Sequence, residues 1–311
     1  MINFDTIKTG VILLFVCLLS HAQENTETKL LVLGIAQDAG YPQLNCYKSH
    51  CMPAWENIQL KKMAVSLGIV DNQTKKKYLI EATPDIRQQM YNLHQFINND
   101  YKFGGIFLTH AHIGHYTGLM HFGREAAGTK NINVYAMPKM TEFLINNGPW
   151  SQLVTLKNII LQPLQSQQAV KLSDNLSITP LIVPHRDEFS ETVGFKIKGP
   201  NKTALFIPDI NKWGKWDLSI VEEIKKVDYA LLDATFYNNA EIPNRDMSEI
   251  PHPFVEESMK LFDKMPTNDK KKVIFIHFNH SNPLLQKDSD AQKEVKEKGY
   301  NFAYEGMSLN L

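Results

Sequence analysis

The stretch that decides the fold is FLTHAHIGHYTGL, residues 107–119, in which three histidines follow a short apolar segment. His110 and His112 are two residues apart, so on extended backbone their side chains point the same way. A tight turn eased by Gly114 would bring His115 back toward them. Three imidazoles that converge at the end of a strand suit zinc or another transition metal. Unrelated surface histidines, or a histidine-rich helix start, are the alternative interpretation.

Other apolar runs also end in a candidate ligand. VIFIH ends in His277, LIVPH ends in His185, ALFIPD ends in Asp209 and KYLIE ends in Glu81. Strands hold ligand geometry rigidly, while the loops beyond them leave an open position for water or substrate. A single histidine after a strand is more often structural, so the order of these residues along the chain carries the signal.

Apolar runs and helical stretches alternate along the chain, without an internal repeat or a low-complexity linker. Strands are predicted at 30–36, 63–70, 77–81, 105–108, 133–136, 169–172, 176–183, 192–197, 203–207, 229–232 and 273–277. Helices are predicted over 84–97, from Pro138, over 218–226 and over 254–264. The turn at Asp71-Asn72 predicts a hairpin between the second and third strands. Hairpins mixed with crossover helices predict an α/β (α+β) fold, with two sheets face to face and helices outside.

The N-terminus is distinct from this pattern. Lys8 precedes an apolar run at 10–19, and small residues follow up to Ala22. These features are typical of a secretory signal peptide, so we predict that residues 1–22 are removed after Ala22. The run is too short to span a bilayer comfortably, although an uncleaved anchor is the alternative. We expect residues 23–311 to form one domain that is periplasmic or secreted, with no stable membrane insertion.

The composition bounds the partners of the protein. The chain has 311 residues, of which 33 are basic and 33 acidic, so its formal net charge is zero. A neutral chain offers no overall attraction for nucleic acid or for an anionic membrane surface. We therefore expect a small-molecule substrate and no nucleic acid. The oligomeric state is not indicated by the sequence.

Two cysteines, Cys46 and Cys51, remain after removal of the predicted signal peptide. In an oxidising compartment, a local disulfide or free thiols are the default interpretation. A structural metal held by these cysteines and His50 is the alternative. That site would need a fourth ligand, which the local sequence does not supply.

The order of the candidate ligands resembles that of the metallo-β-lactamase superfamily, across nearly the whole mature chain. The resemblance implies an αββα sandwich with metals at one edge, between the sheets. The ligands that it implies are His110, His112 and His185 for one ion and His115 and His277 for a second, with Asp209 bridging. The superfamily motif has Asp directly before its third histidine, where this chain has Gly114. That acid normally ligates the second metal, so the second site would be weaker or absent unless Asp187 or Glu81 substitutes.

Four segments narrow the resemblance further. GIAQDAGYPQLNC, EATPDIRQQM, THAHIGHYTGL and IHFNHSNPLL resemble the family of pyrroloquinoline quinone biosynthesis protein B. That family is cytoplasmic, carries a denser cysteine cluster, and departs from the metal-binding histidine set that this chain largely retains. The resemblance therefore implies an exported relative in which hydrolysis fits better than cofactor synthesis.

The activity implied by the resemblance is hydrolysis of an ester, lactone, amide or phosphodiester by a metal-bound hydroxide, since a metal lowers the pKa of water to about 7. The catalytic candidates are Asp209 and His252. His252 matches the substrate-binding histidine of the phosphodiesterase branch, where it would contact a substrate anion or protonate a leaving group. One or two zinc ions are expected, and iron or manganese stays open. An iron-dependent oxidative enzyme related to quinone cofactor maturation and a non-catalytic binding protein are the alternatives.

Overall fold

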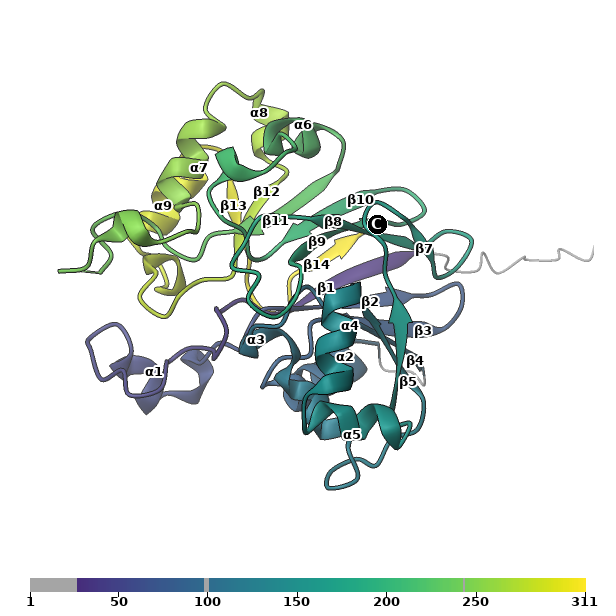
Figure 1. The fold of residues 1–311 in the computed structure, drawn as a ribbon. Coiled ribbons are helices and arrows are strands. Elements are labelled where there is room, and N and C mark those ends of the chain that lie inside the picture. The colour runs from purple at the N-terminus through teal and green to yellow at the C-terminus, as the bar shows by residue number, and fades with distance from the viewer. Residues whose placement is uncertain (1–26, 98–100, 243) are drawn as a thin grey trace, which may run out of the picture.

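The computed structural model describes residues 27–97, 101–242 and 244–311, so the predicted signal peptide lies outside the described residues. Within them, two seven-stranded sheets form the centre of the molecule (Figure 1). The first sheet has the order β14 (Ser308–Asn310), β1 (Thr28–Gly34), β2 (Ser66–Asp71), β3 (Lys76–Ile80), β4 (Lys102–Phe107), β5 (Ile132–Ala136) and β6 (Ile159–Pro163). The second has the order β13 (Asn301–Phe302), β12 (Val273–Ile276), β11 (Tyr229–Asp233), β10 (Thr203–Ile207), β9 (Val193–Lys198), β8 (Ser177–Ile182) and β7 (Val170–Lys171).

The helices lie beside the sheets, with α2, α4 and α5 on the side of the first sheet and α6 to α9 on the side of the second (Figure 1). Their bounds are α1 (Met52–Glu56), α2 (Ile86–Ile97), α3 (Ile113–Tyr116), α4 (Pro138–Asn146), α5 (Trp150–Thr155), α6 (Ile220–Lys225), α7 (Val255–Leu261), α8 (Thr267–Lys270) and α9 (Asp290–Glu297). Among the described residues, no helix combines the length and the apolar character that crossing a membrane requires.

Both sheets are mixed, and they are built alike. β1, β2 and β3 pair antiparallel, whereas β3, β4, β5 and β6 pair parallel. In the second sheet, β7 to β10 are antiparallel and β10 to β13 are parallel. The predicted hairpin is confirmed, because β2 pairs antiparallel with β3 across the turn that follows Asp71. The predicted fold class, two mixed sheets with helices, is confirmed as well.

Strand alternation explains the layers. In β1, Leu30 and Val32 belong to a core cluster that contains residues of both sheets. Leu31 and Leu33 belong to a second cluster, which the first sheet shares with α2, α4 and α5. Successive strand residues point to opposite faces, so one apolar strand serves both the core between the sheets and the core beneath the helices. The continuous apolar runs of the sequence arise from this double burial.

The two strands that lead to the histidine motif and to His277 each end one residue earlier than predicted. β4 ends at Phe107 and β12 ends at Ile276, so the histidines lie in the loops just beyond them. Three strands, β6, β13 and β14, and five short helices, α1, α3, α5, α8 and α9, were not predicted from the sequence. β13 and β14 have two and three residues, too few for a recognisable pattern, and α9 (DAQKEVKE) has only two apolar residues.

Candidate metal centre

The turn that carries the histidine motif is fixed to the end of the first sheet. After β4, the chain turns into the short helix α3, and the backbone N–H of Ala82 donates to the carbonyl of His115 at 2.9 Å. The N–H of Gly118 donates back to the carbonyl of Ala82, also at 2.9 Å. A Cβ atom on Gly118 would collide with the carbonyl of Thr83, so glycine permits this close approach. The loop after β3 therefore holds His115 in place.

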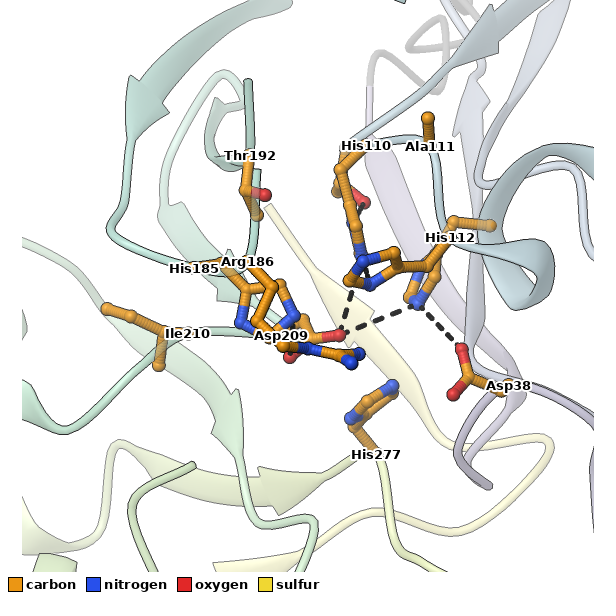
Figure 2. A network of polar contacts seen from close by, with 12 residues as sticks. Asp38, His110, Ala111, His112, His185, Arg186, Thr192, Asp209, Ile210 and His277 are labelled. Atoms are coloured by element: carbon orange, nitrogen blue, oxygen red, sulfur yellow. Dashed lines mark hydrogen bonds and ion pairs between the residues drawn. The ribbon is translucent and has the colours of Figure 1, made fainter. Parts of the chain in front are cut away.

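The first ligand group comprises His110, His112, His185 and Asp209, whose ligand atoms all lie within 4.8 Å of one another. Nε2 of His110 lies 2.8 Å from Nδ1 of His112 and 3.4 Å from the Asp209 carboxylate. Nε2 of His185 lies 3.2 Å from the other Asp209 oxygen. Figure 2 shows the four side chains facing one common space between the two halves of the molecule. The structure thus brings together four of the six predicted ligands.

The second ligand group comprises Asp38, His115 and His277, again with ligand atoms within 4.8 Å of one another. Nε2 of His115 lies 3.6 Å from Asp38 and 3.9 Å from Asp209. Asp209 therefore lies between the two groups, as expected for a bridging residue. The sequence analysis missed Asp38, since an isolated acid in a loop has no signature. The one available signal was its position in the segment GIAQDAGYPQLNC, a few residues after the end of β1.

Two threonine hydroxyls orient the imidazoles. Thr109 Oγ1 donates to Glu81 at 2.6 Å and therefore accepts from Nδ1 of His110 at 2.8 Å. In the same way, Thr235 Oγ1 donates to the Asp233 carboxylate at 2.7 Å and lies 2.9 Å from Nδ1 of His277. A histidine that donates from Nδ1 keeps a lone pair on Nε2.

His115 is oriented by a carboxylate instead of a hydroxyl. Its Nδ1 donates to Glu81 Oε1 at 3.1 Å. As in His277, the other ring nitrogen, Nε2, has no hydrogen-bond partner among the described residues and faces the second ligand group.

Buried polar atoms without a hydrogen-bond partner show whether the centre suits a bound cation. Among the described residues, atoms without a hydrogen-bond partner include Nε2 of His115, His185 and His277, Oδ1 of Asp38 and Oδ1 of Asp209. A buried polar atom that lacks a partner costs about 1–3 kcal/mol. Five such atoms from different elements converge on one space, and imidazole with carboxylate is a donor set that divalent transition metals accept. The residues fit a metal.

The protonation states differ between the groups. Burial and the neighbouring imidazole of His252 lower the pKa of His185 to about 2, and burial lowers that of His110 well below 6.5. Both rings are neutral and ready to ligate. Burial opposes the charge on His115, yet Glu81 and Asp38 outweigh it and raise its pKa to about 9. Burial raises the pKa of Asp209 to about 7.

Glu81 and Asp187, the two possible substitutes for the acid absent at Gly114, both have other hydrogen-bond partners. Glu81 accepts hydrogen bonds from Thr109 and from Nδ1 of His115, on the side of the ring away from Asp38. Asp187 accepts a hydrogen bond from Thr192 Oγ1 at 2.8 Å. Neither residue belongs to one of the ligand groups that the described residues form.

His252 lies at the edge of the centre. Its Nδ1 is 2.9 Å from Asp233 and 3.2 Å from Asp209. Burial disfavours its charge, but these two carboxylates raise its pKa to about 9. The ring lines a cavity of about 420 Å³ together with Arg186 and Arg245. The sequence analysis did not identify Asp233, which is fully buried at the end of β11.

A family model described as the beta-lactamase superfamily domain matches residues 76–278. The chain belongs to this superfamily. The expected membership is confirmed, and the buried histidine and aspartate groups form the kind of metal site that is typical of the superfamily's hydrolases.

Relatives of this superfamily member align over nearly its whole length. Coenzyme PQQ synthesis protein B of Klebsiella pneumoniae (strain 342) is 26% identical over 309 residues, covering 90% of this chain and 97% of the relative. The protein of the same name from Gluconobacter oxydans (strain 621H) is 25% identical, covering 91% and 98%. The similarity to proteins of this name, expected from the four segments, is confirmed.

Solved structures confirm the metallo-β-lactamase fold. Zn²⁺-bound PqqB from Methylobacterium extorquens has a TM-score of 0.76 at 22% identity, covering 91% of this chain and 100% of the other. A diphosphatase from the PhnP family has a TM-score of 0.61 at 20% identity, covering 92% and 97%. At such identities the likeness concerns the fold alone.

The cysteine loop of this superfamily member lies apart from the two ligand groups. Cys46 and Cys51 form a disulfide, which was one of the expected states. His50 and His280 lie with them, and one ligand atom from each of the four is within 4.8 Å of the others. His280 is therefore the fourth residue that the local sequence did not supply. Nδ1 of His280 lies 3.0 Å from the side-chain oxygen of Asn279.

Proposed function

We propose that the protein is a metal-dependent hydrolase of a small ester, lactone, amide or phosphodiester. The observation that carries the proposal is the convergence of two unpaired imidazole nitrogens, Nε2 of His115 and Nε2 of His185, on Asp209 from the two halves of the sandwich. Zinc is the cation that we propose, because a set of imidazoles and carboxylates suits it, with iron or manganese as the other choices. A bound metal of this kind lowers the pKa of water to about 7 and polarises the oxygen of the group under attack.

Two residues of the chain have proposed roles in the reaction. Asp209 contacts both ligand groups, so its carboxylate accepts the proton of the attacking water or orients it. His252 is held by Asp233 and Asp209 and stays protonated at neutral pH, because its pKa is raised to about 9. A protonated imidazole beside the cavity is placed to give its proton to the leaving group.

The cavity supports a negatively charged substrate. Its lining includes two arginines, Arg186 and Arg245, beside His252, against a single carboxylate, that of Glu249. Guanidinium groups bind phosphate or carboxylate oxygens through paired hydrogen bonds. We therefore propose a small phosphodiester or a carboxylate-bearing ester within the wider substrate class.

We also propose that the protein acts outside the cytoplasm, in the periplasm or as a secreted enzyme. The signal-like segment supports this, and so does the disulfide between Cys46 and Cys51, a bond that oxidising compartments preserve.

A panel assay tests the function. Purified zinc-loaded protein is assayed on phosphodiester, lactone, ester and β-lactam substrates, with His252→Asn and Lys61→Gln as variant and control. We expect the protein to hydrolyse an anionic substrate of the panel and to lose this activity when a chelator removes the metal. His252→Asn should lower kcat. Lys61→Gln should leave kcat unchanged, since Lys61 lies on the exposed surface. A fully zinc-loaded protein that hydrolyses nothing would leave a binding protein as the better interpretation.

A second candidate is an iron-dependent oxidative enzyme related to quinone cofactor maturation. It is favoured by the alignment with coenzyme PQQ synthesis protein B over 90% of the chain. Oxygen consumption by iron-loaded protein, with no hydrolysis by the zinc-loaded form, would select this candidate.

A further inference from the structure

The space in which the superfamily motif places its acid is filled by another part of the chain. A Cβ atom built on Gly114 would collide with Cα of Asp38 and would lie 2.8 Å from the carbonyl oxygen and from Oδ1 of Asp38. The loop after β1 therefore occupies the position that a side chain at residue 114 would need. Glycine at 114 is a requirement of this packing.

The carboxylate of Asp38 points at the second ligand group. Its Oδ1 is buried, has no hydrogen-bond partner among the described residues, and lies 3.6 Å from Nε2 of His115. Nε2 of His277 is also unpaired, and all three ligand atoms lie within 4.8 Å of one another. Figure 2 shows Asp38 and His277 on the same side of Asp209.

The backbone holds Asp38 there at a conformational cost. Asp38 has φ +35° and His277 has φ +69°, a region that residues other than glycine rarely adopt. The two segments are joined, because the N–H of Gln37 donates to the carbonyl of Phe278 and the N–H of Phe278 donates to Ile35, both at 2.8 Å. Strained backbone that its surroundings maintain is concentrated at functional sites.

We propose that Asp38 is the carboxylate ligand of the second metal position, together with His115 and His277, and that it replaces the acid absent at Gly114. The ligand has moved from the histidine motif to the loop after β1, and Gly114 makes the room. The proposal rests on the metal centre of the proposed function and names a residue outside the superfamily motif. Glu81 and Asp187 are bound to other partners, as described above.

Zinc counting tests the proposal without any substrate. Metal-depleted wild type, Asp38→Asn and the control Asp187→Asn are saturated with zinc, desalted and analysed by mass spectrometry of the bound metal. Asn keeps the size of the side chain and removes its charge. We expect about two zinc ions in the wild type and in the control and about one in Asp38→Asn, with unchanged circular dichroism in all three.

Two results overturn the proposal: Asp38→Asn that retains the wild-type zinc content and affinity, or a wild type that binds one ion only. If Asp38→Asn does not fold, Asp38→Ser, which is smaller and polar, replaces it in the same experiment. Failure of the proposed function is distinguishable, because a chain that binds zinc through Asp38 and hydrolyses nothing would leave this inference intact.

An exchange of ligands gives a second test. Gly114→Asp alone should lose the second zinc ion, since its side chain collides with the loop that carries Asp38. Adding Asp38→Gly should not restore the second zinc ion, because the collision involves the Cα and the carbonyl oxygen of residue 38, which glycine retains. A single Gly114→Asp variant that binds at least as much zinc as the wild type would contradict the proposed exchange.

Discussion

The carboxylate of Asp209 belongs to the first ligand group and also lies next to the second, but the two groups differ in charge and in the segments that carry them. The first group adds neutral imidazoles on short loops beyond strands, and the His185 side chain in it is fully buried. The second contains Asp38 on a strained loop, with 30% of its side chain exposed, and His115 with a pKa raised to about 9. A cation that binds His110 and His185 displaces no proton from either ring, whereas in the second group it replaces the proton of His115. We infer that the first position fills first.

The largest effect is expected from the residue that the groups share. Asp209→Asn keeps the shape of the side chain and removes the charge that faces both groups. Zinc affinity at both positions should fall by more than about 100-fold, a larger loss than that of an outer partner. Calorimetric zinc titration measures it, with the exposed Asp217→Asn as the matched control. Normal affinity at either position would mean that Asp209 does not bridge.

Replacing one histidine in each group should show whether the two metal positions fill independently. His185→Gln should lose the first zinc ion and abolish hydrolysis, while His277→Gln should lose the second ion and keep partial activity. Each variant should retain about one zinc ion when saturated and desalted. If either substitution empties both positions, the groups form one cooperative site, and the comparison between them no longer holds.

The pH dependence should also differ between the positions. Below pH 9 a cation at the second group must displace the proton of His115, so its affinity should rise about tenfold per pH unit between pH 7 and 9. At the first group, His110 and His185 are already neutral and only Asp209, with a pKa of about 7, still loses a proton, so affinity should rise by no more than about twofold over this range. Titration in chelator-buffered zinc measures both. If zinc affinity changed equally with pH at both positions, the assigned protonation states would be contradicted.

The smallest effect is expected from the orienting hydroxyls. Thr235→Val removes the hydroxyl next to Nδ1 of His277 and should weaken zinc binding at the second position by about 10- to 100-fold. Thr235→Ser keeps the hydroxyl and should restore most of the affinity. If both variants bind zinc equally well, packing and not the hydrogen bond orients His277.

The histidines of the two groups could be predicted from the sequence, whereas Asp38 could not. His110, His112 and His277 follow short apolar strands, and local pattern places such residues at the end of a sheet. Asp38 follows an apolar strand too, but its role depends on tertiary contacts between Gln37 and Phe278. No local pattern encodes a contact between such distant segments.

Glu81 illustrates a different limit. Its position next to the end of β3 was predicted, but its carboxylate belongs to neither ligand group. The backbone at Glu81 has φ +78°, and its carboxylate meets Thr109 and Nδ1 of His115. Spacing along the chain gives the neighbourhood of a side chain, whereas backbone conformation decides which atom it contacts.

Anomalous diffraction from zinc-loaded crystals, recorded on both sides of the zinc absorption edge, tests the account most directly. The account predicts one zinc peak among His110, His112 and His185, a second among Asp38, His115 and His277, and the Asp209 carboxylate between them. A single peak, or a second peak that Asp38 does not contact, would contradict it.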